Sequence, residues 1–354
     1  MKRLTFIAML LLAILFVNTS FAEFIVKTIY FQPAGAPALA DVQEKISKLS
    51  IDSQQLYASE MDRHGFGEKT YRLEKDADDN VIIHHVVGEH AANHYVFSTS
   101  SKVFPELPDG LNPDTSPWNK QDTIRVIVVG GITLVNGRSW GVGWPRHSNR
   151  YGGSCVMAGA SPHFDVNLIF HEIGHCFGLY HKEDGTSGTL EHYEARRLDK
   201  HYHFNDNANN FTYPQPVKNT PTMTIIGNGL VRFELELTSD IGLHQAQIFR
   251  KTDIIVLDWD YLNGKGKDTA MFEVKRDRWS SVVVLEVMDT RGNYHMRDIS
   301  VVLPDEEPDP KNPDLNIQET KEDERTEDKT QPIGFRLSSK NKLTTSWAKI
   351  KRRR

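Results

Sequence analysis

The chain has 354 residues and a formal net charge of −5 at pH 7, and 39% of its residues are hydrophobic. This length accommodates one medium domain and a smaller one, and the mildly acidic balance argues against a nucleic-acid-binding function, because nucleic acids attract basic surfaces. Two cysteines do not make a disulfide framework, so a hydrophobic core of ordinary size must hold the fold.

The first 22 residues are typical of a secretory signal peptide. A cationic start, Lys2-Arg3, precedes an apolar run over residues 4–17, and small residues precede the expected cleavage point before Glu23. The apolar run is short for a membrane span, which leaves an uncleaved anchor as the alternative. We therefore expect a secreted protein, or one kept in the periplasm or cell envelope, with no membrane span after cleavage of residues 1–22.

Apolar patterning predicts an α/β layer after the signal peptide. A helix is expected over residues 38–63, where apolar residues recur at intervals of three and four. Thr123–Val129 is apolar apart from Thr123 and Arg125, as in a strand buried on both faces. A glycine-rich stretch with Trp140 and Trp144 follows, and these tryptophans either form a substrate wall or pack in the core. Asp165 then takes the N-cap position of a further helix. The predicted strands span residues 24–31, 69–73, 80–87, 123–129 and 152–158.

The composition changes after residue 205. Residues 206–216 are rich in Asn, Asp and Pro, as in a linker. Short β-rich runs separated by turns follow, and their spacing predicts a β-sandwich of immunoglobulin-like size. These runs span residues 222–226, 230–237, 243–250, 254–257, 269–275, 281–288 and 294–302. The predicted domains are a signal peptide at 1–22, an α+β domain at 23–210, an all-β sandwich at 217–303 and a charged, disordered tail at 304–354.

One short run, HEIGHCFGLYH, carries metal-binding chemistry. His171 and His175 are four residues apart and share one face of a helix. Gly178 can end that helix in a left-handed conformation, so that His181 returns to the same ion. Three neutral imidazoles leave the fourth position of a tetrahedral zinc ion open, which is typical of a catalytic site. Glu172 has a free carboxylate that can take a proton from water and pass it to a leaving amine.

The motif resembles that of the metzincin zinc peptidases, His-Glu-x-x-His-x-x-Gly-x-x-His. Residues 24–205 also resemble a group of little-characterised bacterial exported metzincin-like proteins. The resemblance implies a metzincin-like catalytic domain, with a twisted mixed sheet and an active-site helix. It implies that Zn²⁺ is bound by His171, His175 and His181, and that Glu172 is the general base.

The resemblance also implies an edge strand and a methionine turn. The peptide substrate would lie along the edge strand before the helix, at residues 155–159. Metzincins place a methionine-containing turn after the third histidine, whereas residues 182–193 contain no methionine. Met223 is the next methionine and lies in the segment assigned to the sandwich. Either Met223 forms the turn or the turn is lost.

Two further pairs of residues leave alternatives open. His90 and His94 have the spacing of helical metal ligands, but no third ligand follows, which favours a solvated or hydrogen-bonded pair over a second metal site. Cys155 lies on the predicted edge strand and Cys176 on the histidine helix. A disulfide between them and two buried thiols are both compatible with these positions.

The sequence therefore predicts an exported zinc-dependent endopeptidase that acts on proteins or peptides and contacts a cell surface through its C-terminal domain. The alternative is a catalytically degenerate zinc-binding surface or adhesion protein that acts through its β-sandwich. The missing methionine turn favours this alternative. Retention of Glu172, which holds no metal, favours the enzyme.

Overall fold

The computed structural model describes residues 24–37, 41–112, 123–145, 153–181, 188–201, 214–217, 220–227, 229–275 and 282–300. The predicted signal peptide and the predicted tail at 304–354 lie outside the described residues. Among the helices that are described, none is both long and apolar enough to cross a membrane.

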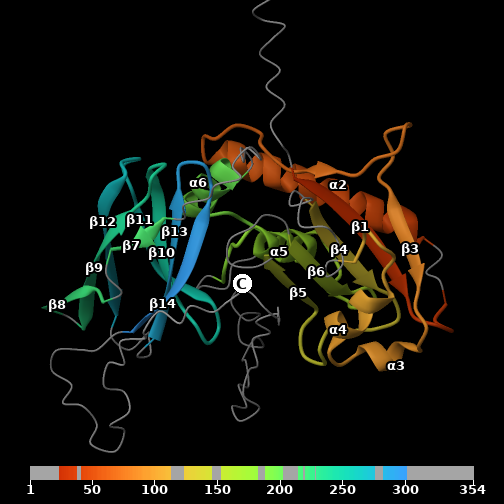
Figure 1. Ribbon diagram of the computed structural model, residues 1–354. Coiled ribbons are helices and arrows are strands. Elements are labelled where there is room, and N and C mark those ends of the chain that lie inside the picture. The colour runs from red at the N-terminus through yellow and green to blue at the C-terminus, as the bar shows by residue number, and fades with distance from the viewer. Residues whose placement is uncertain are drawn as a thin grey trace, which may run out of the picture. The chain divides into compact units, whose positions relative to one another are not determined.

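The first half of the chain forms a mixed β-sheet (Figure 1). The strands lie in the order β2-β1-β4-β6-β5, and β3 also pairs with β1. The pairing is parallel except between β5 and β6, which are antiparallel. The five predicted strands are confirmed, and β5 adds a strand that was not predicted. The bounds are β1 Ile25–Gln32, β2 Arg72–Leu73, β3 Ile83–Val87, β4 Thr123–Val129, β5 Gly141–Pro145 and β6 Gly153–Ala158.

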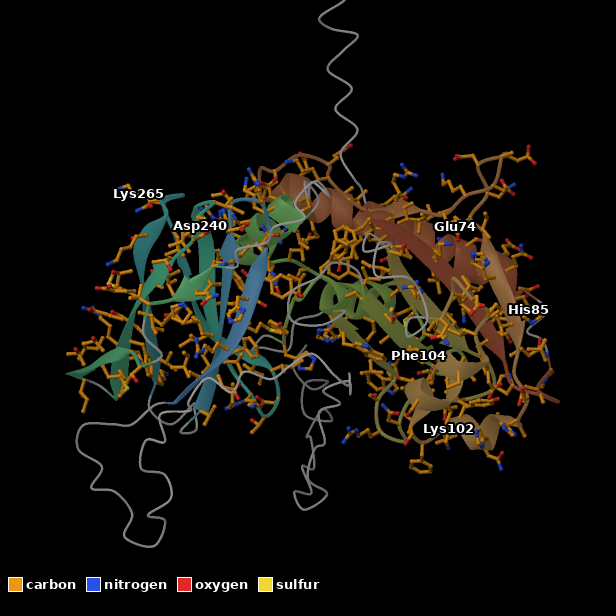
Figure 2. All side chains as sticks on the ribbon, in the orientation of Figure 1. Glu74, His85, Lys102, Phe104, Asp240 and Lys265 are labelled. Carbon is orange, nitrogen blue, oxygen red and sulfur yellow. The ribbon has the colours of Figure 1, made fainter. Side chains whose placement is uncertain are left out.

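Hydrophobic clusters cover both faces of this sheet. Helices α2 (Val42–Arg63) and α5 (Val166–Cys176) pack on one face, where the ring of Tyr57 stacks on Phe170 with the centroids 4.1 Å apart. The other face is covered by the segment of α3 (Ala92–Tyr95), α4 (Thr99–Val103) and the 3₁₀ helix η1 (Phe104–Glu106), on which Figure 2 marks Lys102 and Phe104. Burial of both faces explains why β4 is apolar at every position except Thr123 and Arg125, which are themselves buried.

The second half of the chain forms two antiparallel sheets (Figure 1). One has the order β11-β10-β13-β14, and in the other β9 pairs with β12, β7 and β8. Apolar side chains that alternate along the strands form the core between the sheets. All seven predicted runs are strands, and helix α6 (His192–His201) precedes them. The bounds are β7 Gln215–Pro216, β8 Thr222–Gly227, β9 Leu230–Thr238, β10 Leu243–Arg250, β11 Ile255–Tyr261, β12 Lys267–Lys275, β13 Val282–Asp289 and β14 Tyr294–Ser300.

Met223 belongs to this second core. It lies in β8, pairs with Phe233 of β9 and packs against the apolar cluster between the two sheets. A residue held in a strand ladder does not form a turn, so Met223 is excluded as the methionine turn.

Strands β10 and β13 are buried on both faces. Arg197 of α6 forms an ion pair with Glu286 of β13, and these two side chains are 2% and 0% exposed. Gln247 of β10 donates from Nε2 to Glu286 Oε1 at 3.0 Å. These contacts attach the β-rich half of the chain to the helix that follows the histidine motif.

Candidate metal centre

Helix α5 carries the first two histidines, and local sequence sets both of its ends. Asp165 is the N-cap, as predicted, and its Oδ1 accepts a hydrogen bond from the Leu168 amide at 3.0 Å. At the other end Gly178 has φ +71°, and the amides of Gly178 and Leu179 bond back to the last turn at 2.9 Å each. This is a Schellman motif, in which glycine occupies the left-handed position. The chain reverses there toward His181.

The side chains of His171, His175 and His181 converge. One potential ligand atom from each lies within 4.8 Å of the other two. The Nε2 atoms of His171 and His175 are 3.1 Å apart, close to the ~3.3 Å expected for two nitrogens at 2.0–2.1 Å from a tetrahedral zinc ion. Within the described ranges, no other group of three or more His, Cys, Asp or Glu side chains meets this distance criterion.

Backbone carbonyls orient two of the three rings. His175 Nδ1 lies 2.7 Å from the Leu179 carbonyl oxygen, and His181 Nδ1 lies 3.2 Å from that of Asp253. A ring that donates from Nδ1 presents an unprotonated Nε2, which is the form that binds a metal. Burial lowers the pKa of His175 well below its usual value and also lowers the pKa of His181. Three imidazoles, two of them oriented in this way, fit a zinc ion.

Glu172 lies beside these ligands with one oxygen uncommitted. The residue is 4% exposed, and Oε2 has no hydrogen-bond partner among the described residues. Burial raises the pKa of Glu172 to about 8, and a bound cation nearby would lower it again. The carboxyl group is therefore able to exchange a proton with a water or substrate molecule that reaches it.

Strand β5, and not the predicted segment 155–159, forms the edge of the sheet next to α5. The segment 155–159 falls mostly in β6, which lies between β4 and β5. A Cβ at Gly143 would lie 2.3 Å from the backbone oxygen of Glu172, so only glycine allows the strand to approach the helix this closely. Glycine has a low strand propensity, which is why this strand was not predicted. The alternating pattern Gly141-x-Gly143 was the available signal.

Gly141 controls the space available to the Glu172 carboxyl group. A Cβ at Gly141 would lie 2.6 Å from Glu172 Oε1 and 2.8 Å from its Cδ. We expect Gly141→Ala to push the carboxyl group aside and to lower kcat/KM by about 10²-fold, since a misplacement of 1 Å can have an effect of that size. Steady-state assays, with zinc content measured on the same preparation, test this. Unchanged activity in the zinc-loaded variant would show that the carboxyl position is unimportant.

The two tryptophans near the edge strand have different environments. Trp140, directly before β5, is 43% exposed and stacks on His163 with the ring centroids 3.6 Å apart. Trp144 is partly buried against the apolar cluster on the far face of the sheet, with its ring centroid 5.8 Å from that of Phe104. Trp144 therefore packs in the core, whereas Trp140 is accessible beside the edge strand.

The remaining pairs identified in the sequence form no second site. Cys155 and Cys176 are buried free thiols, and Cys176 Sγ contacts the Glu172 carbonyl oxygen at 3.4 Å. The structure thus has the two buried thiols rather than the disulfide. His90 and His94 have ring centroids 4.1 Å apart, and they belong to no group of three potential ligands among the residues described.

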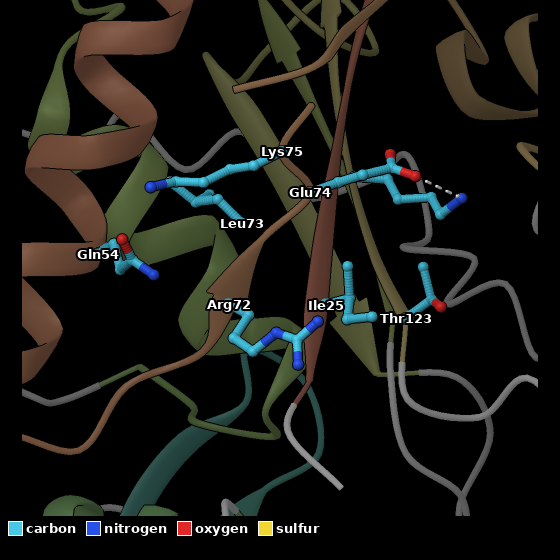
Figure 3. Close-up of a pocket in the computed structure, with 8 residues that line it drawn as sticks. Ile25, Gln54, Arg72, Leu73, Glu74, Lys75 and Thr123 are labelled. Atoms are coloured by element: carbon cyan, nitrogen blue, oxygen red, sulfur yellow. Dashed lines mark ion pairs between the residues drawn. The ribbon is translucent and has the colours of Figure 1, made fainter. Parts of the chain in front are cut away.

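A pocket of about 610 Å³ lies elsewhere on the sheet (Figure 3). It is lined by residues of β1, α2 and the β2 segment and by Thr123 of β4, and Lys27 Nζ in its wall pairs with Glu74 Oε1 at 3.0 Å. It contains none of the three histidines and not Glu172. The pocket is therefore separate from the metal centre.

Comparison with known proteins identifies the segment around the histidines. A model of the family described as Peptidase M66 matches residues 143–231, which begin in β5 and include all three histidines and Glu172. No curated protein matches the chain.

Solved structures with a similar fold include wild-type OgpA from Akkermansia muciniphila in two crystal forms, with TM-scores of 0.51 and 0.52. Both are 16% identical to this chain, and the similarity covers 78% of this chain and 92% of OgpA. A third similar structure is catalytically inactive OgpA in complex with an O-glycopeptide substrate, glycodrosocin. Its TM-score is 0.50 at 15% identity, with the same coverage.

Proposed function

We propose that this chain, a zinc metallopeptidase with a Peptidase M66 segment at residues 143–231, is an exported endopeptidase whose zinc is held by His171, His175 and His181. One observation carries the assignment: three imidazole nitrogens converge within 4.8 Å on the helix end that also holds a buried carboxyl group with an uncommitted oxygen.

The residues of the site divide the chemistry of peptide hydrolysis between them. Zinc, when bound, supplies a Lewis acid that polarises the scissile carbonyl and makes water a stronger nucleophile. Glu172 takes a proton from the attacking water at Oε2 and returns it to the leaving amine. The carbonyls of Leu179 and Asp253 hold two of the histidine rings in the metal-binding tautomer.

The edge strand β5 offers a binding surface for an extended peptide. Among the described strands β5 pairs with β6 alone, and we propose that the backbone groups on its other side bind a substrate strand. Gly141 contacts the Glu172 carboxyl group, so a peptide paired with this strand would pass beside the general base. We propose that the substrate binds along β5.

Glycopeptides are the substrate class that we propose to test alongside plain peptides. The similar OgpA structure is a complex with an O-glycopeptide. In this chain the exposed Trp140, stacked on His163, lies directly before β5. A partly exposed tryptophan of this kind suits the apolar face of a sugar ring.

Three further elements of the proposal rest on sequence patterns. We propose that residues 1–22 direct export and are removed, so that the protein is secreted or remains in the cell envelope. We propose that residues 23–210 are the catalytic domain, and that residues 217–303 form an immunoglobulin-like domain that contacts a cell surface.

The test measures metal content and cleavage together. The purified protein is assayed for zinc and incubated with an unstructured protein, an O-glycosylated peptide and the same peptide without its sugar. We expect bound zinc, cleavage that a chelator abolishes and added zinc restores, and faster cleavage of the glycosylated peptide. Well-folded, zinc-loaded protein that cleaves none of the three would favour the non-catalytic binding protein. Equal cleavage of both peptides would remove the glycopeptide preference alone.

A further inference from the structure

The third histidine is held differently from the first two. His171 and His175 are fixed by helix α5, whereas His181 follows the turn at Gly178. The His181 amide donates to the Ile254 carbonyl at 3.1 Å, and the Val256 amide donates to the His181 carbonyl at 3.0 Å. These bonds form a parallel β-bridge between His181 and the start of β11. Both backbone groups of His181 therefore depend on the β-rich half of the chain.

The ring of His181 depends on the same segment. Its Nδ1 lies 3.2 Å from the carbonyl oxygen of Asp253, in the turn that joins β10 to β11. This bond places the Nδ1 proton toward Asp253 and leaves Nε2 to face the other two histidines. Residues 253–256 thus hold the backbone and the ring of His181 at once.

The turn from β10 to β11 has its own support. Arg250 forms a bidentate ion pair with Asp253, in which Nε donates to Oδ1 at 2.7 Å and Nη2 donates to Oδ2 at 2.6 Å. Lys251 forms an ion pair with Asp298 of β14. Ile254 has φ +52°, a conformation that a β-branched residue adopts only when its surroundings enforce it. The side-chain pairs thus fix a turn whose backbone is unfavourable by itself.

The residue before His181 is anchored to the same sheet. The Tyr180 hydroxyl donates to Glu286 Oε2 at 3.0 Å, and its ring lies over Phe249 with the centroids 4.4 Å apart. Tyr180 therefore contacts strands β10 and β13. His181, the proposed ligand, contacts the turn after β10.

We propose that the turn from β10 to β11 is a positioning element for the third metal ligand, and that Arg250 and Asp253 are its positioning residues. The inference rests on the proposed function, in which His181 binds the zinc. On this inference the β-rich half of the chain helps to form the metal site, although neither Arg250 nor Asp253 touches the metal.

The test breaks the pair that fixes the turn and measures zinc binding. Full-length Arg250→Gln and Asp253→Asn are each titrated with zinc in competition with a chromophoric chelator. We expect the Kd for zinc to rise by about five- to tenfold. Breaking an exposed ion pair has a small effect by itself, whereas removing a group that directly supports a metal ligand lowers metal affinity by about 10- to 100-fold. The double variant should show no larger loss than either single variant, because both remove the same pair.

A second readout separates positioning from general stability. Cobalt(II) replaces zinc, and its visible spectrum reports the geometry of the ligands. We expect altered band positions in both variants. The matched control is Arg232→Gln, which breaks a similarly exposed pair with Glu273 between β9 and β12. This control should keep the wild-type zinc affinity and cobalt spectrum.

The outcomes distinguish this inference from the proposed function. His181→Ala is included and should weaken zinc binding more than any turn variant. Wild-type affinity and spectrum in Arg250→Gln and Asp253→Asn, alongside a large loss in His181→Ala, would overturn the positioning role and leave the zinc site intact. Undiminished zinc binding in His181→Ala would overturn the proposed ligand set itself.

Discussion

Replacing Glu172 with glutamine is expected to abolish peptide cleavage while zinc remains bound. The substitution keeps the size of the side chain and removes its ability to accept a proton. General acid–base catalysis contributes about 10²–10⁴-fold to the rate, so kcat should fall by about 10²-fold or more. The zinc ligands are untouched, and Oε2 has no partner among the described residues to lose. The melting temperature should therefore not fall.

The measurement pairs steady-state kinetics with zinc content and thermal unfolding of the same samples. Glu68→Gln is the control, because Glu68 is an exposed glutamate in the loop between α2 and β2. It should match the wild type in all three measurements. Full activity in zinc-loaded Glu172→Gln would overturn the proton-transfer role. Loss of zinc from that variant would show instead that the carboxyl group helps to hold the metal.

The largest loss of stability is expected from Arg197→Met. Arg197 and Glu286 form an ion pair between α6 and β13 with almost no exposure to solvent. Removing one partner of a buried pair leaves an uncompensated charge, which lowers the free energy of unfolding by about 3–5 kcal/mol. Glu286 also accepts from the Tyr180 hydroxyl, so the damage extends to the residue before the third histidine. Urea unfolding with and without zinc measures both consequences.

Neutralising the partner should recover part of that loss. In Arg197→Met combined with Glu286→Gln neither position of the pair leaves a buried charge, and glutamine still offers an oxygen to Tyr180. The coupling energy in this cycle should be about 0.5–3 kcal/mol, the range for residues in direct contact. The exposed pair of Arg232 and Glu273 gives the comparison, since breaking such a pair costs about 1 kcal/mol or less. If the stability losses of the two single variants add fully in the double variant, the ion pair has no coupling energy and contributes nothing specific to stability.

The parts of the site that the sequence predicted are those set by local spacing. Two histidines four residues apart on a helix meet for geometric reasons, and Gly178 in the left-handed conformation ends that helix as expected. The strands of both halves were predicted for a similar reason, because apolar periodicity depends on neighbouring residues. The location of the N-cap at Asp165 also followed from a local rule.

The parts that were missed depend on contacts between distant segments. Strand β5 is glycine-rich because α5 lies against it, and the predicted substrate strand was therefore placed one strand too far into the sheet. Met223 packs in the second core instead of forming a turn near the histidines. The bonds that hold His181 come from residues more than 70 positions later. No spacing rule in a single sequence encodes such pairings.

The bridge between His181 and β11 also bears on the order in which the chain is synthesised. Residues 171–181 leave the ribosome well before residues 253–256, which supply the hydrogen bonds to the third histidine. A nascent chain that ends before the turn from β10 to β11 has the complete histidine motif but lacks the bonds that hold His181. The three-histidine arrangement thus requires residues 253–256 in addition to the motif itself.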